Sequence, residues 1–143
     1  MLNQDREAQA AARAALEQLQ KSPLRRYFPT LEADGLLQLG RAQLRSGEAA
    51  AARSAFERAL ALRSAEDHAN SPWIAEAQIG LAGCLLASGD SRTARLLLRR
   101  AAAIHATHPE LGTHFTQPLV DLRLALEKQE RDGARRVIAK SKA

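Results

Sequence analysis

Aromatic residues are scarce in this chain, since one Trp, one Tyr and three Phe make up only 3% of its 143 residues. Gly and Pro are also few, at eight and five. A core with so few large rings must come from close packing of smaller side chains. The sequence supplies 30 Ala and 22 Leu for this purpose. Both residues are strong helix formers, so the composition predicts an all-α protein of one domain's length.

The chain has a single cysteine, Cys84, which excludes an internal disulfide and fits a reducing compartment. Its leucine neighbours, Leu81, Leu85 and Leu86, predict that the thiol is a small buried hydrophobe. There is no run of about 18 apolar residues, so no membrane span is expected. The beginning of the chain is charged from residue 5 and does not read as a signal peptide. These features predict a cytoplasmic protein.

Patterns that carry chemistry are also missing from the sequence. It has no glycine-rich phosphate loop after a strand and no pair of residues suited to named catalytic roles. His105, His108, Glu110 and His114 lie near one another in the chain, but their spacing does not predict a tetrahedral zinc site. We therefore expect no enzyme activity, no cofactor and no bound metal.

The sequence contains an internal repeat. The stretch 36–62 reads as two antiparallel helices joined by a turn at 46–48, and a second copy follows 42 residues later. Internal repetition of this kind predicts stacked helical hairpins. The matching positions in the two copies are Leu39, Gly40, Leu44, Gly47, Ala52, Phe56 and Ala59, and Leu81, Ala82, Leu86, Gly89, Ala94, Leu98 and Ala101.

With Leu36, the first set of positions closely resembles the tetratricopeptide repeat, whose unit is about 34 residues long. The match is strong over 36–62 and good over 78–104, where Ala82 replaces a glycine and Leu98 an aromatic residue. This resemblance implies antiparallel helical hairpins stacked in a short right-handed solenoid of about six helices and a C-terminal stub. The period of 42 exceeds the unit length, and the excess falls at 63–71, as a longer second helix or a longer link.

The expected layout is a single helical-repeat domain over 1–143. Its parts are an N-terminal helix in 1–22, repeat one in 30–65, repeat two in 72–106, a closing helix in 117–131 and a stub or tail in 134–143. Thr30 is expected to cap a helix, Leu31 to face inward and Trp73 to anchor the core. Asp132-Gly133 is expected to be a turn.

In this family, the first helix of each pair lines a concave groove that receives a peptide or a helix of a partner protein. Carried over to this chain, the groove positions are Asp34, Leu37, Gln38, Arg41, Arg45, Glu76, Ile79, Gly83, Arg123 and Glu127. Gly80 joins them, and Gly80 and Gly83 fit either close helix packing or a slot for an apolar side chain. The Lys and Asn clamp that some members use for a terminal carboxylate is absent, since only Arg41 could substitute for it.

The leading functional expectation is thus a non-catalytic module that binds another protein. Residues 73–119 also resemble the closing repeats of larger bacterial regulators, such as serine/threonine kinases or transcription regulators, which implies a regulatory segment of a signalling system. The alternatives are a basic adaptor that contacts nucleic acid through Arg92, Arg95 and Arg99, and self-assembly into a homodimer through an end helix. The net charge of +5 is scattered rather than clustered, which disfavours nucleic acid.

Overall fold

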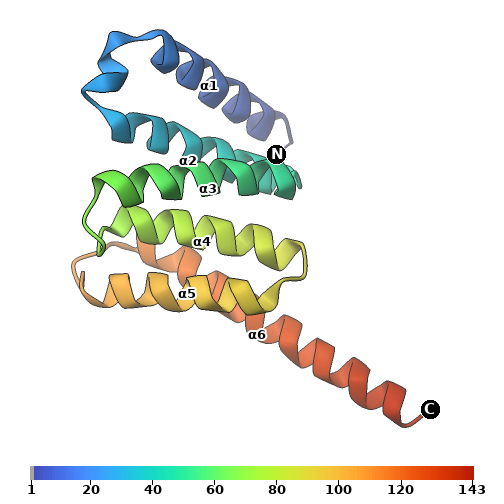
Figure 1. Ribbon diagram of the computed structural model, residues 1–143. Helices are drawn as coiled ribbons and strands as arrows, with labels where there is room; N and C mark the ends of the chain where they lie inside the picture. The colour runs from blue at the N-terminus through green and yellow to red at the C-terminus, as the bar shows by residue number, and fades with distance from the viewer. Residues whose placement is uncertain (1) are drawn as a thin grey trace.

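The computed structural model describes residues 2–143, with side chains from Asn3 onward, and this range contains helices and no strand (Figure 1). The helices are α1 (Leu2–Lys21), the short 3-10 helix η1 (Pro23–Arg26), α2 (Pro29–Arg45), α3 (Ala49–Glu66), α4 (Pro72–Ala87), α5 (Ser91–Ala106) and α6 (Thr113–Ser141). The predicted all-α class is confirmed. None of these helices combines the length and apolarity that a membrane span requires.

Neighbouring helices pack on one another in chain order, as a helical solenoid requires. The closest pairs are α2 with α3 and α4 with α5, which are the two predicted hairpins. The helix α1 packs on α2, α3 packs on α4, and α6 closes the stack against both α4 and α5. Figure 1 shows this succession from α1 at one end of the molecule to α6 at the other.

Two matching turns make the hairpins. Gly47 and Gly89 have φ angles of 79° and 87°, a left-handed conformation that favours glycine. After each glycine the chain closes the preceding helix in the same way, because the amide of Glu48 donates to the carbonyl of Gln43 and that of Asp90 to Leu85, both at 2.9 Å. The sequence repeat of 42 residues is therefore also a repeat of backbone geometry.

The core combines alanines at the helix contacts with leucines, isoleucines and a single large ring. Ala52, Ala59, Ala94 and Ala101 are fully buried at the matching positions of α3 and α5. Phe56 of α3 is among the largest fully buried side chains. Because alanines keep the helix axes close together, the apolar cluster is continuous from α2 through α5 and reaches Leu119 and Leu126 of α6.

The extra length of the first repeat is shared between a helix and a link. The helix α3 has 18 residues and its counterpart α5 has 16. Residues 67–71 then connect α3 to α4, and Ser71 caps α4 by accepting a hydrogen bond from the amide of Trp73. The additional residues at 63–71 therefore lie partly in a lengthened second helix and partly in the link, which are the two possibilities that the sequence left open.

The start of α2 differs from the prediction. The helix begins at Pro29 after Phe28, without a side-chain cap, so the expected cap at Thr30 is wrong. Proline suits this position because the first amide of a helix has no partner within it. Leu31 was expected to face inward but is 46% exposed, because it lies in the first turn, beyond the cover of the neighbouring helices.

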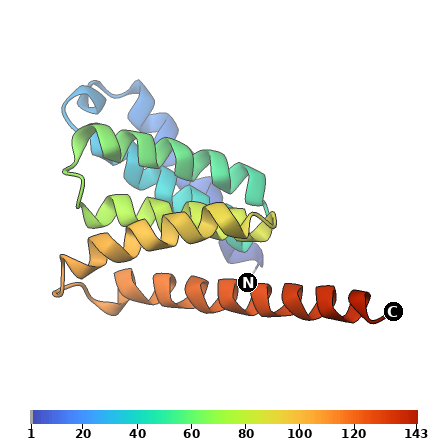
Figure 2. The same ribbon diagram turned by 60° about the horizontal axis from the view of Figure 1, so that its bottom comes forward.

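The closing helix is the largest departure from the prediction. It begins at Thr113 rather than 117 and continues without a break to Ser141, so neither a turn at Asp132-Gly133 nor a separate stub exists. The strong helix formers on both sides of this dipeptide outweigh the cost of one glycine, about 1 kcal/mol relative to alanine. Figure 2 shows the far half of α6 extending well past the ends of the other helices.

Candidate functional site

A groove with a volume of about 420 Å³ lies where α2, α4 and α6 meet, and we call it the inner groove. Its walls are the side chains of Arg41, Leu44, Arg45, Phe56, Glu76, Ile79, Gly80, His114, Phe115, Pro118, Asp121 and Leu122. These residues come from the first helix of each repeat and from the closing helix, together with the ring of Phe56. The site is thus assembled by the stacking of the hairpins.

The floor of the inner groove is apolar, because two glycines allow an aromatic ring of α3 to reach it. Phe56 of α3 reaches between α2 and α4, where it lies against Gly40 and Gly80. A Cβ at Gly40 would lie 2.9 Å from this ring, and one at Gly80 would lie closer still. The glycines therefore admit the ring between the helices, where it is 1% exposed and lies beneath the groove beside Gly80.

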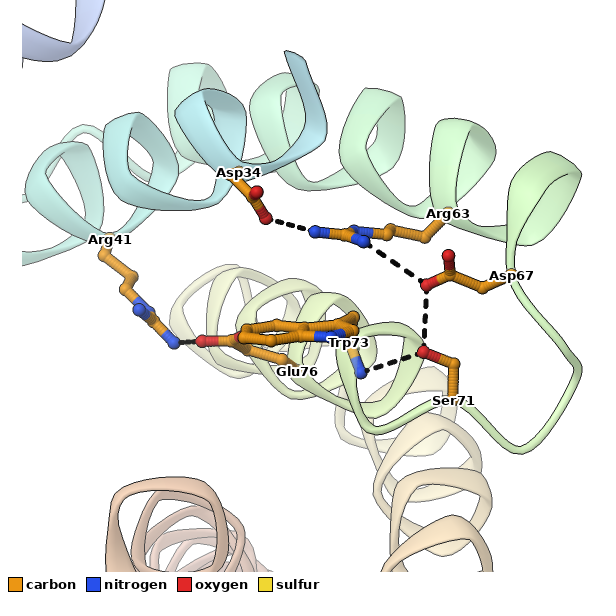
Figure 3. A network of polar contacts seen from close by, with 7 residues as sticks. All are labelled: Asp34, Arg41, Arg63, Asp67, Ser71, Trp73 and Glu76. Atoms are coloured by element: carbon orange, nitrogen blue, oxygen red, sulfur yellow. Dashed lines mark hydrogen bonds and ion pairs between the residues drawn. The ribbon is translucent and has the colours of Figure 1, made fainter. Parts of the chain in front are cut away.

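Two charged residues, Arg41 of α2 and Glu76 of α4, form an ion pair across the groove (Figure 3). The Glu76 side chain is only 10% exposed, and its Oε1 meets the guanidinium of Arg41. Its second oxygen, Oε2, is buried and has no hydrogen-bond partner in the described chain. Burial, with a smaller effect from Arg45, lowers the pKa of Arg41 from its ordinary value. The groove thus holds a compensated charge pair with one unused acceptor.

The positive charge of Arg45, at the edge of the same groove, is compensated by an acidic residue of α1. Its Nε donates to Oδ1 of Asp5 at 2.7 Å, which ties α1 to the end of α2. Gln9 of α1 adds hydrogen bonds to Ser46 at 3.1 Å and to Glu48 at 2.9 Å. The N-terminal helix is therefore fixed across the first hairpin turn, and the groove carries little net positive charge from Arg41 and Arg45.

The structure brings together five of the positions that the sequence placed in the groove. Arg41, Arg45, Glu76, Ile79 and Gly80 all line it. For Gly80, the structure shows the close packing that the sequence suggested, since a Cβ there would meet the ring of Phe56, and a slot for an apolar side chain stays a prediction.

Two of the predicted groove positions lie in the interior instead. Leu37 is 2% exposed and belongs to the core, because α2 packs against α1, α3 and α4 at once. Gly83 is buried, and a Cβ there would lie 3.0 Å from Leu44. The placement of Leu37 and Gly83 in an open groove was wrong.

The remaining predicted positions lie outside the groove. Arg123 and Glu127 face a separate hollow between α5 and α6. Gln38 is exposed but is not part of the groove wall, and Asp34 pairs with Arg63 of α3. Arg123 and Glu127 lie beside Leu126, on the part of α6 that faces α5 and not α2 or α4.

Residues of this first turn and the next are the ones that the sequence analysis missed. His114, Phe115, Pro118, Asp121 and Leu122 form the α6 wall of the groove. Their spacing of three or four residues follows one side of a helix. The available signal was Phe115, which lies one turn before Leu119 and on the same side of the helix, but the expected helix began only at 117.

A second polar cluster lies beside the groove, centred on Arg63 (Figure 3). Arg63 is 5% exposed and its guanidinium contacts Asp34 of α2 and Asp67 at the end of α3. Asp67 in turn accepts a hydrogen bond from Ser71 at 2.9 Å. The cluster joins α2, α3 and the link to α4, which explains how the longer first repeat keeps a fixed geometry.

Trp73 lies over this cluster rather than in the core. Its ring is 5.2 Å from the Arg63 guanidinium carbon and packs edge-on against Phe115, with centroids 5.3 Å apart. It is 42% exposed, so its prediction as a core anchor was wrong. As the first residue after Pro72 it lies at the N-terminal end of α4, where its ring contacts Arg63 and Phe115.

The histidines and the cysteine have separate surroundings. His108 connects the segment between α5 and α6 with the segment between α3 and α4. Its ring contacts the Asn70 carbonyl at 2.7 Å and Glu110 at 3.0 Å. Both contacts raise the pKa of His108. Cys84 is buried as predicted, and burial raises the pKa of its thiol to about 11. Within residues 2–143, no three His, Cys, Asp or Glu side chains are placed to hold a metal ion.

The arginines considered for nucleic-acid contact lie on α5. Arg92, Arg95 and Arg99 are all exposed there. Arg95 forms an ion pair with Glu130 of α6, and Arg99 borders a hollow that also holds Glu127 and Glu130. Acidic side chains therefore alternate with basic ones on this surface, which does not favour binding to a polyanion.

Comparison with known proteins agrees with the hairpin geometry. The family model described as tetratricopeptide repeat matches residues 31–106, which span the two complete hairpins and more than half of the chain. No curated protein and no solved structure gave a significant match. Repeats of this family generally mediate protein–protein interactions. On the repeat pattern, the stacked hairpins and this match, the chain belongs to the tetratricopeptide repeat family.

Proposed function

We propose that this chain is a non-catalytic module that binds a short segment of a partner protein in the inner groove. The segment carries one large apolar side chain, which enters the groove, and a hydrogen-bond donor beside it. The observation that carries the proposal is the combination of a groove with apolar walls and the unused Oε2 of Glu76.

The apolar anchor follows from the walls. Leu44, Phe56, Ile79, Phe115 and Leu122 surround the space beside Gly80. A buried large apolar side chain contributes about 1.5–3 kcal/mol, and such anchors dominate most protein interfaces. A volume of about 420 Å³ suits one large side chain and part of the adjoining backbone.

The donor follows from Glu76. A buried polar atom without a partner costs free energy, and a ligand that supplies the missing hydrogen bond recovers it. Because Arg41 already compensates the charge of Glu76, a neutral N–H group of the bound segment is sufficient. Strongly charged segments are not favoured, since Arg45 is also paired.

The test is selection from a random peptide library displayed on phage, with the purified chain as the target. We expect the enriched peptides to share one large apolar residue. Their binding can be followed through Trp73, the only tryptophan, because its ring contacts Phe115 of the groove wall. A change in Trp73 emission on titration gives the affinity of each peptide.

Two variants of α6 locate the binding. Pro118→Arg places a long charged side chain in the groove from an exposed position, and Val120→Arg does the same on another side of the helix. We expect Pro118→Arg to weaken peptide binding at least tenfold and Val120→Arg to leave it unchanged. Failure to enrich any peptide, or equal binding by both variants, would reject the proposal.

A further inference from the structure

The closing helix α6 has an exposed side that lies outside the inner groove and borders α5 at Glu127, and we call it the outer face. Leu119 and Leu126 are buried toward the solenoid, and Phe115 and Leu122 face the inner groove. Val120, Leu124 and Ile138 are large apolar residues on the other side, exposed by 47%, 59% and 54%. Val120 and Leu124 are one turn apart and Ile138 is about 21 Å farther along the helix. Exposed apolar residues that share one face of a helix are typical of interaction surfaces.

The residues of the outer face have the same spacing whether the helix is read forward or backward. Its positions are Val120, Leu124, Glu127, Arg131, Ala134 and Ile138, all of them exposed. They are separated by four, three, four, three and four residues, which is the spacing of a seam between two packed helices. The seam is roughly 27 Å long at 1.5 Å per residue.

This symmetry makes the face complementary to itself when two copies run antiparallel. With the midpoint at Gln129, Val120 meets Ile138 of a second copy and Leu124 meets Ala134. A large side chain is thus placed opposite a small one, and a twofold axis repeats each contact. In the same register, Glu127 of each copy meets Arg131 of the other, which gives two pairs of opposite charge. A parallel arrangement would instead place like charges together.

The charges on this face are available for such pairing. Neither Glu127 nor Arg131 has an ion-pair partner within residues 2–143. Glu127 borders the hollow between α5 and α6, in which the ion pair of Arg95 is formed with Glu130 instead. Figure 2 shows that the second half of α6, which carries half of these positions, projects beyond the neighbouring helices.

We propose that two copies of this chain associate through the outer face of α6 as an antiparallel pair centred on Gln129. The face is on a different side of α6 from the inner groove. Two grooves therefore remain open in the dimer, and binding of a partner segment does not depend on it.

The first test measures association by sedimentation over a series of protein concentrations. We expect a reversible monomer–dimer equilibrium for the wild type. Arg131→Glu places a glutamate opposite Glu127 in both of the symmetry-related contacts. It should weaken association at least about tenfold, because like charges across an interface repel. The double change Glu127→Arg/Arg131→Glu exchanges the charges and should restore wild-type association.

Arg136→Glu is the matched control, since it makes the same change of charge on an exposed residue two positions from Ala134, on the opposite side of the helix. It should leave association unchanged. Circular dichroism confirms that each variant is folded. A chain that remains monomeric at about 1 mM, where a dimer with a Kd of about 1 mM would be half formed, would overturn the proposal. Equal association by Arg131→Glu and Arg136→Glu would also overturn it.

Disulfide trapping tests the register. In a Cys84→Ala background, one chain carries Val120→Cys and a second carries Ile138→Cys. Mixing under oxidation should give the mixed dimer 120–138 well above the two symmetric products. A predominance of 120–120 or 138–138 would contradict the antiparallel register even if a dimer exists.

Discussion

The ring of Phe56 on α3 packs directly against the backbone of Gly80 on α4, so the second helix of one repeat meets the first helix of the next through a missing side chain. The same ring lies against Gly40 of its own repeat. One aromatic residue thus joins three helices and also forms part of the floor of the inner groove. The stability of the stack and the shape of its groove therefore depend on the same contact.

Gly80→Ala tests this contact. The new Cβ would overlap the ring of Phe56, whose space is limited on its other side by Gly40, so α3 and α4 must separate or the ring must shift. We expect the free energy of unfolding to fall by about 1–3 kcal/mol, as in other overpacked cores. Chemical denaturation followed by circular dichroism measures it.

Gly133→Ala is the matched control, because nothing lies within 4 Å of a Cβ at this position in the middle of α6. It should stabilise the helix by up to about 1 kcal/mol, since alanine is a better helix former than glycine. If Gly80→Ala is as stable as wild type, the ring does not occupy this space in solution.

Phe56→Ala removes the largest part of the core. The side chain is 1% exposed, and its loss leaves a cavity between α2, α3 and α4. We expect a decrease of about 3–5 kcal/mol in the free energy of unfolding, from lost apolar burial and the cavity together. Urea titration of the variant beside wild type measures this decrease, and a loss below about 1 kcal/mol would show that Phe56 is not a core residue.

Arg63→Met tests the polar cluster beside the groove. Methionine keeps much of the length of the side chain but leaves Asp34 and Asp67 without their partner. We expect a decrease of about 2–3 kcal/mol in the free energy of unfolding, because Asp34 is only partly buried and water replaces some of the lost contact. Thermal unfolding measured by calorimetry provides the comparison.

Arg53→Met provides the reference for that variant, since Arg53 forms an exposed pair with Glu57 on the same helix. It should change stability by less than about 0.5 kcal/mol. Equal effects of the two substitutions would show that the Arg63 cluster is not a structural joint.

His108 predicts a dependence of stability on pH. Its contacts with the Asn70 carbonyl and Glu110 raise its pKa in the folded state above the ordinary value. The stabilisation is therefore fully present below the unfolded pKa of about 6.5 and is lost as the pH rises through the folded pKa. Nearby His105 has a lowered pKa, mainly through burial, and acts in the opposite direction.

A variant separates these two effects. We expect His108→Gln to lower the melting temperature more at a pH of about 5.5 than at about 8, where the wild-type imidazole is largely neutral. The difference between wild type and variant removes the part of the His105 contribution that comes from burial, which is the larger cause of its lowered pKa and is kept in the variant. A difference that does not change with pH would mean that His108 gains no charge-dependent contact on folding.

The hairpins could be predicted from the sequence because their determinants are local. Gly47 and Gly89 mark the turns, and small residues such as Ala52 and Ala94 repeat where two helices approach. The burial of Leu37 could not be predicted, because it depends on how many helices surround α2 in the folded chain. The length of α6 was missed because Asp132-Gly133 has the composition of a turn, while the surrounding residues keep the helix intact.

The same limit applies to the site. Its α2 and α4 walls follow from the repeat, so Arg41 and Glu76 could be placed there from the sequence. The α6 wall requires the correct start of that helix, and the unused oxygen of Glu76 can be recognised only from the packing around it.

Methyl NMR spectra, recorded with and without a peptide selected from the displayed library, test the central claim most directly. If the inner groove is the binding site, the resonances of Leu44, Ile79 and Leu122 will shift most, since these side chains line it. Exposed Leu96 of α5 and Leu124 on the outer face of α6 provide the internal reference and should not move. Shifts centred on Leu96 or Leu124, with the three groove residues unchanged, would contradict binding in the inner groove.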